Sequence, residues 1–280
     1  MTGSIDYELM RNERWSIFDS WVPVKKSEYK SDWHLFEHLL ADYEHVVESK
    51  YEQLHSLLRK WDKHLRDLGG DSTHHNWTDF RPLRLTREED WSDWLAYLFG
   101  ESKTGVFAKC LLGIPHFELL DYARPKKVRR EIGYGGFRAD IIIQWQNNSF
   151  SHIEVKIEDE NLKKTIQTSE CLMKKYYQSR KNWTNFILLR YNHLVNWEGI
   201  NALNNNSNTV IKAITWKDVT VALRRALLSK ENVPWKVWAY SFLGSIEQRI
   251  IGFPGHRLAC MPYEKIDEKI DVLRKGLDNG

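Results

Sequence analysis

Three charged residues interrupt two apolar segments near the middle of the chain, and their types are those of metal-assisted and acid–base chemistry. Asp140 opens the segment DIIIQW, and Glu154 and Lys156 lie in FSHIEVKI. The polar stretch QNNS joins the two segments, which predicts a β-hairpin. Ionised groups buried in a strand cost on the order of several kcal/mol unless they are paired or bind a metal, so these charges need partners.

Strand geometry determines which of the charges meet. Side chains alternate between the faces of a strand, so Glu154 and Lys156 share one face with His152. Asp140 joins them if the connecting loop has an odd number of residues or a bulge, whereas a two-residue turn at Asn147-Asn148 would place it across from Val155. The loop length therefore decides whether the three charges converge.

Convergence of two carboxylates and an ammonium would create a site for a hard cation. Mg²⁺ takes one or two carboxylate oxygens, keeps several waters and can bind a phosphate oxygen. Lys156 could then orient a water molecule or stabilise the charge that develops on a phosphate. The alternative is an exposed hairpin in which Glu154 and Lys156 form a surface ion pair worth under about 1 kcal/mol.

A helix predicted over residues 86–100 supplies a fourth candidate. Thr86 and Glu89 have the spacing of a capping box, and Glu89 points nearly opposite the apolar face of the helix. Glu89 is therefore interpreted as a cap. Glu88 lies at the margin of the apolar face, beside Ser92, and remains available for a site at the edge of the core.

Helices and strands alternate after residue 86, which predicts an α/β class with a mixed sheet. We expect a helical N-terminal region over residues 1–80 and an α/β domain over residues 81–280. The further elements expected are helices over 106–112, 160–180 and from 216, strands over 185–190 and 209–216, and an amphipathic segment over 235–253.

The N-terminal region contains one apolar stripe along a predicted helix from Ser31 to Leu68, which Gly69-Gly70 would end. The stripe consists of Phe36, Leu40, Tyr43, Val47, Tyr51, Leu54, Leu58, Trp61, Leu65 and Leu68. Such a stripe needs a partner, which is either another part of the same chain or a second copy of it.

The spacing of the charged residues resembles a known signature. Asp140, thirteen intervening residues and then Glu-X-Lys on two apolar strands resemble the active site of the PD-(D/E)XK nuclease superfamily. The segment EEDWSDWLAYLF resembles the family's early helix and puts Glu88 in the position of its glutamate. The resemblance implies a restriction-endonuclease-like fold, a mixed central sheet flanked by helices, and Mg²⁺-dependent cleavage of phosphodiesters, with Mn²⁺ as a substitute.

The resemblance also implies individual roles. Asp140 and Glu154 would bind the metal together with the backbone carbonyl of Val155. Lys156 would assist the attacking water, and Glu88 would complete the site through the metal or a water. Accessory roles are implied for Glu131 and Gln167.

Basic residues near the hairpin fit a DNA substrate. The run RPKKVRR has five Lys or Arg among its seven residues. A solvated face is the usual interpretation of such a run, but beside a nuclease site it becomes a phosphate-contacting surface. The expected contacts are Lys126, Lys127, Arg129, Arg130, Lys163 and Lys164.

Composition narrows the remaining possibilities. A net charge of +3 permits a polyanionic partner without requiring one. The three cysteines are widely spaced, which is typical of free thiols in a reducing compartment. No signal peptide or membrane-spanning run is visible, so we expect a cytoplasmic protein without membrane association. His74-His75 is interpreted as part of an exposed loop rather than a metal site.

The leading hypothesis is a metal-dependent DNA endonuclease of restriction, phage defence or mobile-element processing. Double-strand cleavage by one site per chain favours a homodimer, or a partner protein bound through the N-terminal helices. The alternative is a non-catalytic nucleic-acid-binding or assembly subunit that retains the fold. An RNase, or a nuclease switched on by a small-molecule signal, has the same sequence features.

Overall fold

The structure is a computed structural model that describes residues 33–77, 85, 87–114, 120–134, 136–157, 167, 168, 171, 183–190, 211–253 and 261–278. The chain divides into two compact units, Met1–Val47 and Glu48–Gly280. The second unit contains all the described strands. Most of the helix predicted over 160–180 and the residues Lys163, Lys164 and Cys260 lie outside the described residues.

A five-stranded mixed sheet forms the centre of the second unit and confirms the α/β class. Its strands lie side by side in chain order; the first three are antiparallel and the last three parallel. They are β1 (Pro125–Tyr134), β2 (Phe137–Trp145), β3 (Phe150–Val155), β4 (Trp183–Leu189) and β5 (Ile211–Thr215). Connections between parallel strands must cross over the sheet, which explains the long segments before β4 and β5.

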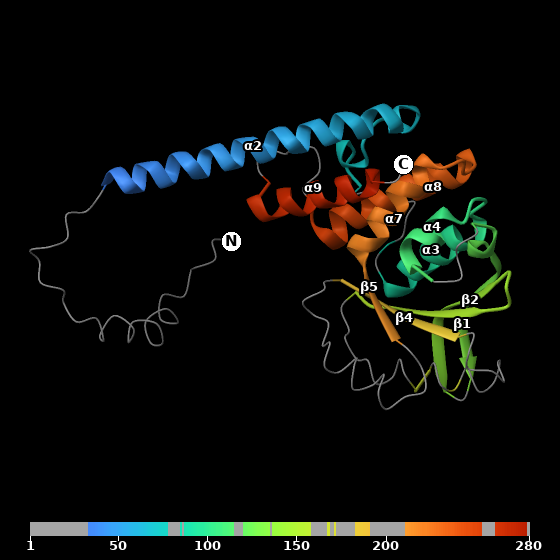
Figure 1. The fold of residues 1–280 in the computed structure, drawn as a ribbon. Coiled ribbons are helices and arrows are strands. Elements are labelled where there is room, and N and C mark those ends of the chain that lie inside the picture. Colours follow the sequence, from blue (N-terminus) through green and yellow to red (C-terminus); the bar gives the residue numbers. More distant parts are fainter. Residues whose placement is uncertain are drawn as a thin grey trace, which may run out of the picture. The chain divides into compact units, whose positions relative to one another are not determined.

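Helices cover one face of this sheet, as Figure 1 shows for α3, α4 and α7. The alternating residues Ile141, Ile143 and Trp145 of β2 belong to the main apolar core, together with Leu95 and Phe99 of α3. The helices of this layer are α3 (Glu88–Glu101), α4 (Val106–Leu112), α7 (Trp216–Leu228) and α8 (Val233–Ser245), with the short turn η3 (Leu120–Ala123) before β1.

The start of α7 follows from two residues. The Thr215 hydroxyl accepts the Asp218 N–H at 3.2 Å, and the Asp218 carboxylate accepts the Thr215 N–H at 2.8 Å. This reciprocal capping satisfies two backbone donors that a helix end leaves open, and caps of this kind are worth about 1 kcal/mol. The predicted helix from Trp216 is thus confirmed.

The start of α3 differs from the prediction. The helix begins at Glu88, and the Asp90 carboxylate accepts the N–H of Arg87 at 3.0 Å. Because the helix starts one residue later than the Thr86 spacing predicts, Asp90 takes the third position. The interpretation of Glu89 as a cap is therefore wrong, and Glu89 instead pairs with Arg138 at 3.0 Å.

The long N-terminal helix is α2 (Trp33–Leu65), followed by the single turn η1 (Arg66–Leu68). Gly69 ends it with φ +98°, a left-handed conformation that favours glycine, which confirms the predicted end. Among its residues from 33 to 46, seven large apolar side chains are exposed. They are Trp33, Leu35, Phe36, Leu39, Leu40, Tyr43 and Val46.

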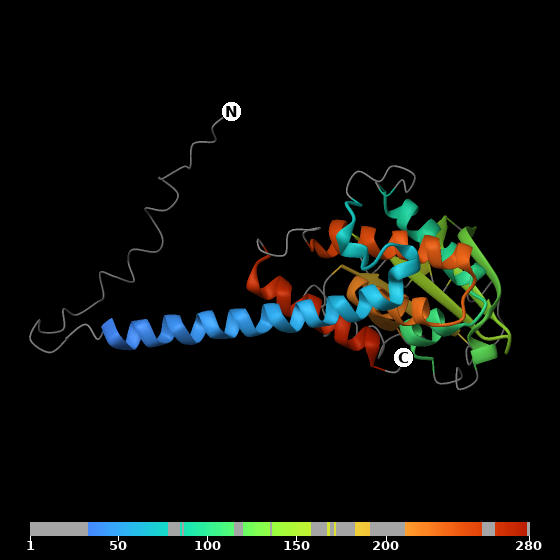
Figure 2. The same ribbon diagram turned by 90° about the horizontal axis from the view of Figure 1, so that it is seen from above.

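The part of α2 that belongs to the second unit has its partner within the chain. Leu54, Leu58, Trp61 and Leu65 are buried there. The Trp61 indole N–H donates to the Leu273 carbonyl at 3.3 Å. Leu273 lies on α9 (Tyr263–Leu277), a helix the sequence did not lead us to expect, and Figures 1 and 2 show it beside this part of α2. None of the helices described in the structure is long and apolar enough to cross a membrane.

Candidate active site

The loop of the hairpin has the odd length on which the site depends. Ile141 pairs with Ile153, and the Trp145 N–H donates to the Ser149 carbonyl at 2.9 Å, which leaves three residues in the loop. The last of them, Asn148, has φ +60°, a conformation that asparagine tolerates better than most residues. Continuing this register places Asp140 across from Glu154.

Asp140 lies where the pairing of β2 with β3 stops. Its Oδ2 accepts the N–H of Val155 at 2.8 Å, so the carboxylate takes the place of a strand partner. Burial raises the pKa of Asp140 most, and the neighbouring Glu154 charge raises it further. The hydrogen bond from Val155 opposes both, and the pKa is raised from 3.8 to about 6. A carboxyl group in this state favours the approach of a positive charge.

Glu154 and Lys156 form an ion pair beside it. Lys156 Nζ lies 3.0 Å from Glu154 Oε1, and both side chains are largely buried. Burial acts to raise the pKa of Glu154, but the contacts with His152 and Lys156 outweigh it and the pKa is lowered. Burial also acts against a charged Lys156, yet the carboxylates of Glu154, Glu88 and Asp140 raise its pKa. Both groups therefore stay ionised at neutral pH.

Glu88 reaches this group from the first turn of α3. Its Oε1 accepts the N–H of Ile157 at 2.7 Å, and its charge contributes to the raised pKa of Lys156. The same end of β3 is tied to β4, because the Lys156 N–H donates to the Leu188 carbonyl at 2.8 Å. The structure thus gathers Glu88, Asp140, Glu154 and Lys156 at one end of the sheet.

The basic residues of β1 point to two different faces. Arg130 is directed to the helices: it pairs with Asp93 and donates to the Ser92 hydroxyl at 3.0 Å and the Glu89 carbonyl at 3.1 Å. The guanidinium of Arg130 thus anchors β1 to α3, and a contact of Arg130 with phosphate stays a prediction.

Lys127 and Arg129 alternate with Arg130 and so point to the opposite face of the sheet. Lys127 pairs with Gln144 and Arg129 with Ile142, residues whose side chains share a face with Asp140. Lys126 is exposed and lies at the point, between Pro125 and Lys127, where the pairing of β1 with β2 is irregular.

The two accessory candidates differ in their surroundings. Glu131 lies at the position of β1 across from Asp140, with φ +48°, and contacts Arg138 at 3.8 Å and Arg130 at 3.3 Å. The pKa of Arg138 is raised by Glu89 and Glu131, and the charge of Asp140 contributes to this rise. Gln167 is helical and exposed.

The residues present fit a metal with few protein ligands. Among the described residues, no group of three or more His, Cys, Asp or Glu side chains could hold a metal ion. A hard cation would thus be held by Asp140, Glu154 and the Val155 carbonyl, with waters in the remaining positions, which is the habit of Mg²⁺. Glu154 Oε2 supports this fit, because it is buried and has no hydrogen bond within the described part of the chain.

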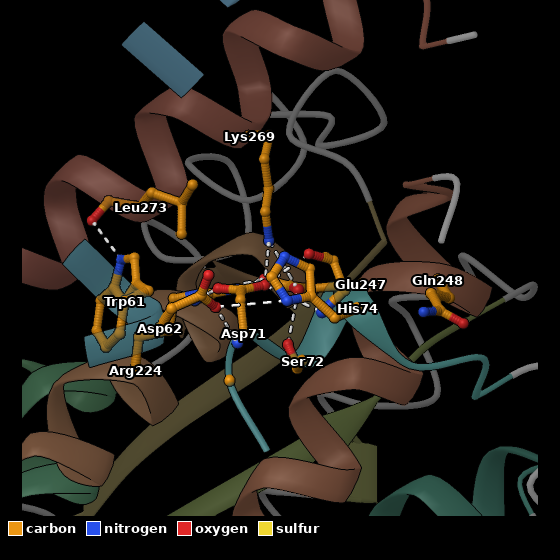
Figure 3. A network of polar contacts seen from close by, with 12 residues as sticks. Trp61, Asp62, Asp71, Ser72, His74, Arg224, Glu247, Gln248, Lys269 and Leu273 are labelled. Carbon is orange, nitrogen blue, oxygen red and sulfur yellow. Dashed lines mark hydrogen bonds and ion pairs between the residues drawn. The ribbon is translucent and has the colours of Figure 1, made fainter. Parts of the chain in front are cut away.

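A second group of buried charged residues lies between the helices and shares no residue with the Asp140 site (Figure 3). We call it the Asp71 network: Asp71, Arg224 of α7, Glu247 of the π-helix η6 (Ile246–Ile251) and Lys269 of α9. None of the four is more than 1% exposed. No local pattern in the sequence indicates this network, because its members are separated by up to 198 positions in the chain.

Every carboxylate oxygen of the Asp71 network has a partner. Arg224 lies 2.8 Å from Asp71 Oδ2 and 2.7 Å from Glu247 Oε1. Lys269 lies 2.8 Å from Glu247 Oε2, and the Thr73 hydroxyl donates to Asp71 Oδ1 at 2.6 Å. Burial opposes ionisation of Asp71, but Arg224 and Lys269 prevail and hold its pKa well below the usual range. The network therefore ties the segment that follows α2 and η1 to α7, η6 and α9.

Comparison with known proteins adds no assignment to this geometry. A scan against protein-family models, a search of curated proteins and a search of solved structures found no match for this chain.

Proposed function

We propose that the protein is a metal-dependent endonuclease that hydrolyses phosphodiester bonds in DNA, built on a restriction-endonuclease-like sheet. The observation that carries the proposal is the register of the hairpin, which puts Asp140 across from Glu154. Lys156 and Glu88 meet these two carboxylates at the same end of the sheet. Two carboxylates and a lysine in one place are the groups that hydrolysis of a phosphate ester needs.

The roles of the side chains follow from their surroundings. Asp140 and Glu154 would hold Mg²⁺ with the Val155 carbonyl, and the bound ion would polarise a phosphate and lower the pKa of a water. Lys156, kept charged by three carboxylates, would orient the attacking water or stabilise the charge on the phosphate. Glu88 fixes the end of β3 through the Ile157 N–H and so keeps Lys156 in place.

The substrate would approach the face of the sheet that carries Lys127 and Arg129. These side chains project from the strand next to β2, on the same face as Asp140. Basic groups in such a row contact the phosphates of nucleic acid without regard to sequence.

The exposed apolar side chains of α2 support a homodimer as part of the proposal. Trp33, Phe36, Leu40 and Tyr43 follow one another at steps of three and four, which is the spacing of a coiled-coil seam. Two chains would bring two sites to one duplex. Sedimentation of the wild type and of Phe36→Glu/Leu40→Glu tests this: a wild type that is monomeric at micromolar concentration would rule the dimer out.

The cleavage assay uses supercoiled plasmid and linear duplex with Mg²⁺, with Mn²⁺ and with EDTA. We expect cleavage with either ion and none with EDTA. Asp140→Asn and Lys156→Met should each lower the rate by about 10²-fold or more, because each removes a group that acts on the charge of the transition state. Asp271→Asn and Lys217→Met are matched controls, since that pair lies 3.7 Å apart and partly exposed on the helical side. Cleavage that survives in Asp140→Asn would sink the proposal.

Binding of DNA without cleavage under any metal condition would favour the second candidate, a non-catalytic nucleic-acid-binding subunit. The same preparations distinguish the two functions if binding is measured with and without Mg²⁺.

A further inference from the structure

A buried histidine adjoins the carboxylate that would bind the metal. His152 is 0% exposed and lies two residues before Glu154 on the same face of β3. Its Nε2 lies 3.6 Å from Glu154 Oε2, and its Nδ1 lies 3.3 Å from Asn185 Oδ1 on β4. The imidazole thus bridges Glu154 and an amide on the next strand.

Trp183 fixes the orientation of that amide. The indole N–H of Trp183 donates to Asn185 Oδ1 at 2.8 Å, and an indole nitrogen can only donate, so the atom that faces it must be the oxygen. The same oxygen faces His152 Nδ1, which must therefore carry a hydrogen. The ring of His152 is also held by the Trp183 ring, 6.4 Å away between centroids.

The other ring nitrogen of His152, Nε2, has no hydrogen bond among the described residues. Nε2 of the same ring faces Glu154 Oε2. At 3.6 Å the contact is longer than a hydrogen bond, and neither His152 Nε2 nor Glu154 Oε2 has another hydrogen bond among the described residues. Buried polar atoms are rarely left so in proteins, and the exceptions gather at functional sites.

The two oxygens of Glu154 are consequently treated differently. Oε1 is held by Lys156 at 3.0 Å, whereas Oε2 is approached, among the residues that the structure describes, by His152 at 3.6 Å. If the carboxylate moves toward Nε2 and this contact closes, both oxygens of Glu154 are held and the orientation of the carboxylate beside Asp140 is fixed. Groups that orient a metal-binding carboxylate in this way are known to tune its affinity for the ion.

We propose that His152 is a positioning residue: held by Asn185 and Trp183, it orients the Glu154 carboxylate for a divalent cation. The inference rests on the proposed function, because it assigns His152 a role in that same site. A merely structural histidine would act on folding and leave the affinity for the ion unchanged.

Two substitutions at one position separate these roles. In His152→Asn the side-chain amide can reach Asn185 as Nδ1 does, but no group replaces Nε2. In His152→Gln the side-chain amide nitrogen can take the place of Nε2 beside Glu154. Binding of Mn²⁺ to the full chain without DNA is measured by titration calorimetry, and the melting temperature of each metal-free variant is recorded.

We expect His152→Asn to weaken Mn²⁺ binding by about 10-fold to 100-fold, the usual effect of removing a group that orients a ligand. His152→Gln should stay within a few-fold of the wild type. Trp183→Phe keeps the aromatic ring but releases the Asn185 amide, so it should weaken binding by a smaller factor and serves if His152→Asn does not fold.

Three outcomes would overturn the inference. The first is equal Mn²⁺ affinity in His152→Asn, Trp183→Phe and wild type, while Asp140→Asn abolishes binding; the proposed function then stands without a role for His152. The second is equal weakening in the Asn and Gln variants, which would assign the effect to packing. The third is a wild type that neither binds Mn²⁺ nor cleaves DNA, which would overturn the proposed function itself.

Discussion

The protein buries charge in two places, and the two differ in how completely the charges are matched. In the Asp71 network, two carboxylates meet two cations, and each carboxylate oxygen has a partner at 2.6–2.8 Å. At the Asp140 site, the three carboxylates of Glu88, Asp140 and Glu154 lie near one lysine, and Glu154 Oε2 has no hydrogen bond among the described residues.

The pKa values express the same contrast. Arg224 and Lys269 outweigh burial and hold the pKa of Asp71 far below its usual range. Burial and Glu154 instead raise the pKa of Asp140 to about 6. Completely matched charges fix helices in place, whereas an unmatched pair of carboxylates retains an affinity for a further cation. The contrast supports a structural role for the Asp71 network, and it is the Asp140 site for which we propose a catalytic role.

The largest expected effect is the loss of Arg224. Arg224→Met would leave Asp71 and Glu247 buried without their main partner, and breaking a buried pair in this way costs about 3–5 kcal/mol of unfolding free energy. Urea denaturation measures it. The matched control is Arg225→Met, the next residue of α7, whose guanidinium donates to the Lys275 carbonyl in an exposed position. If the unfolding free energy changes by less than about 1 kcal/mol in both variants, the Asp71 network does not stabilise the fold as proposed.

The carboxylates of the two places should respond to pH with opposite signs. The folded protein holds the Asp140 proton more tightly than the unfolded chain, so stability falls as the pH rises from about 4 to about 6. Asp140→Asn removes this cost. Without metal it should be more stable than the wild type above pH 6, by about 3 kcal/mol at most.

Asp71 supplies the opposite case. Its pKa is lowered in the folded state, so its contribution to stability is present above the unfolded value near 3.8 and is lost as the pH falls further. Asp71→Asn should therefore be less stable than the wild type at neutral pH. Denaturation curves between pH 3 and pH 8 test both variants, and parallel pH profiles would refute the assigned pKa shifts.

A divalent cation should remove the cost at Asp140. If Mn²⁺ binds the folded chain at a hundred times its dissociation constant, the wild type gains about 2.7 kcal/mol of stability. Asp140→Asn should gain little, and Asp71→Asn should gain as much as the wild type if it folds. Thermal melting with and without Mn²⁺ measures these gains; equal gains in the wild type and Asp140→Asn would place the ion elsewhere.

The meeting of Asp140, Glu154 and Lys156 could be predicted from the sequence because all three belong to one hairpin. Strand alternation brings Glu154 and Lys156 together, and only the loop at residues 146–148 decided whether Asp140 would join them. His152 was visible on the same face but carried no signal of a role, since its partner Asn185 comes from a parallel strand 33 positions later.

The Asp71 network and α9 were beyond prediction for a related reason. Arg224 is one charged residue on a helix that also has exposed ones, and nothing local marks it as buried. Its partners lie up to 153 positions away in the chain, so only the packing of the helices brings them together. The surroundings of Arg130 also depend on packing. It belongs to a basic run, but strand alternation turns its side chain to α3, while its neighbour Arg129 faces the other side of the sheet.

The smallest expected effect concerns that same alternation. Lys127→Ala/Arg129→Ala should weaken DNA binding by about tenfold near 0.15 M salt and reduce the slope of log K against log salt by about 1.8, as two lost phosphate contacts would. Arg59→Ala/Lys60→Ala removes the same charge from exposed positions of α2 and should leave the slope unchanged. If both double variants change binding alike, the effect is one of net charge, and the face that carries Asp140 is not the DNA-binding face.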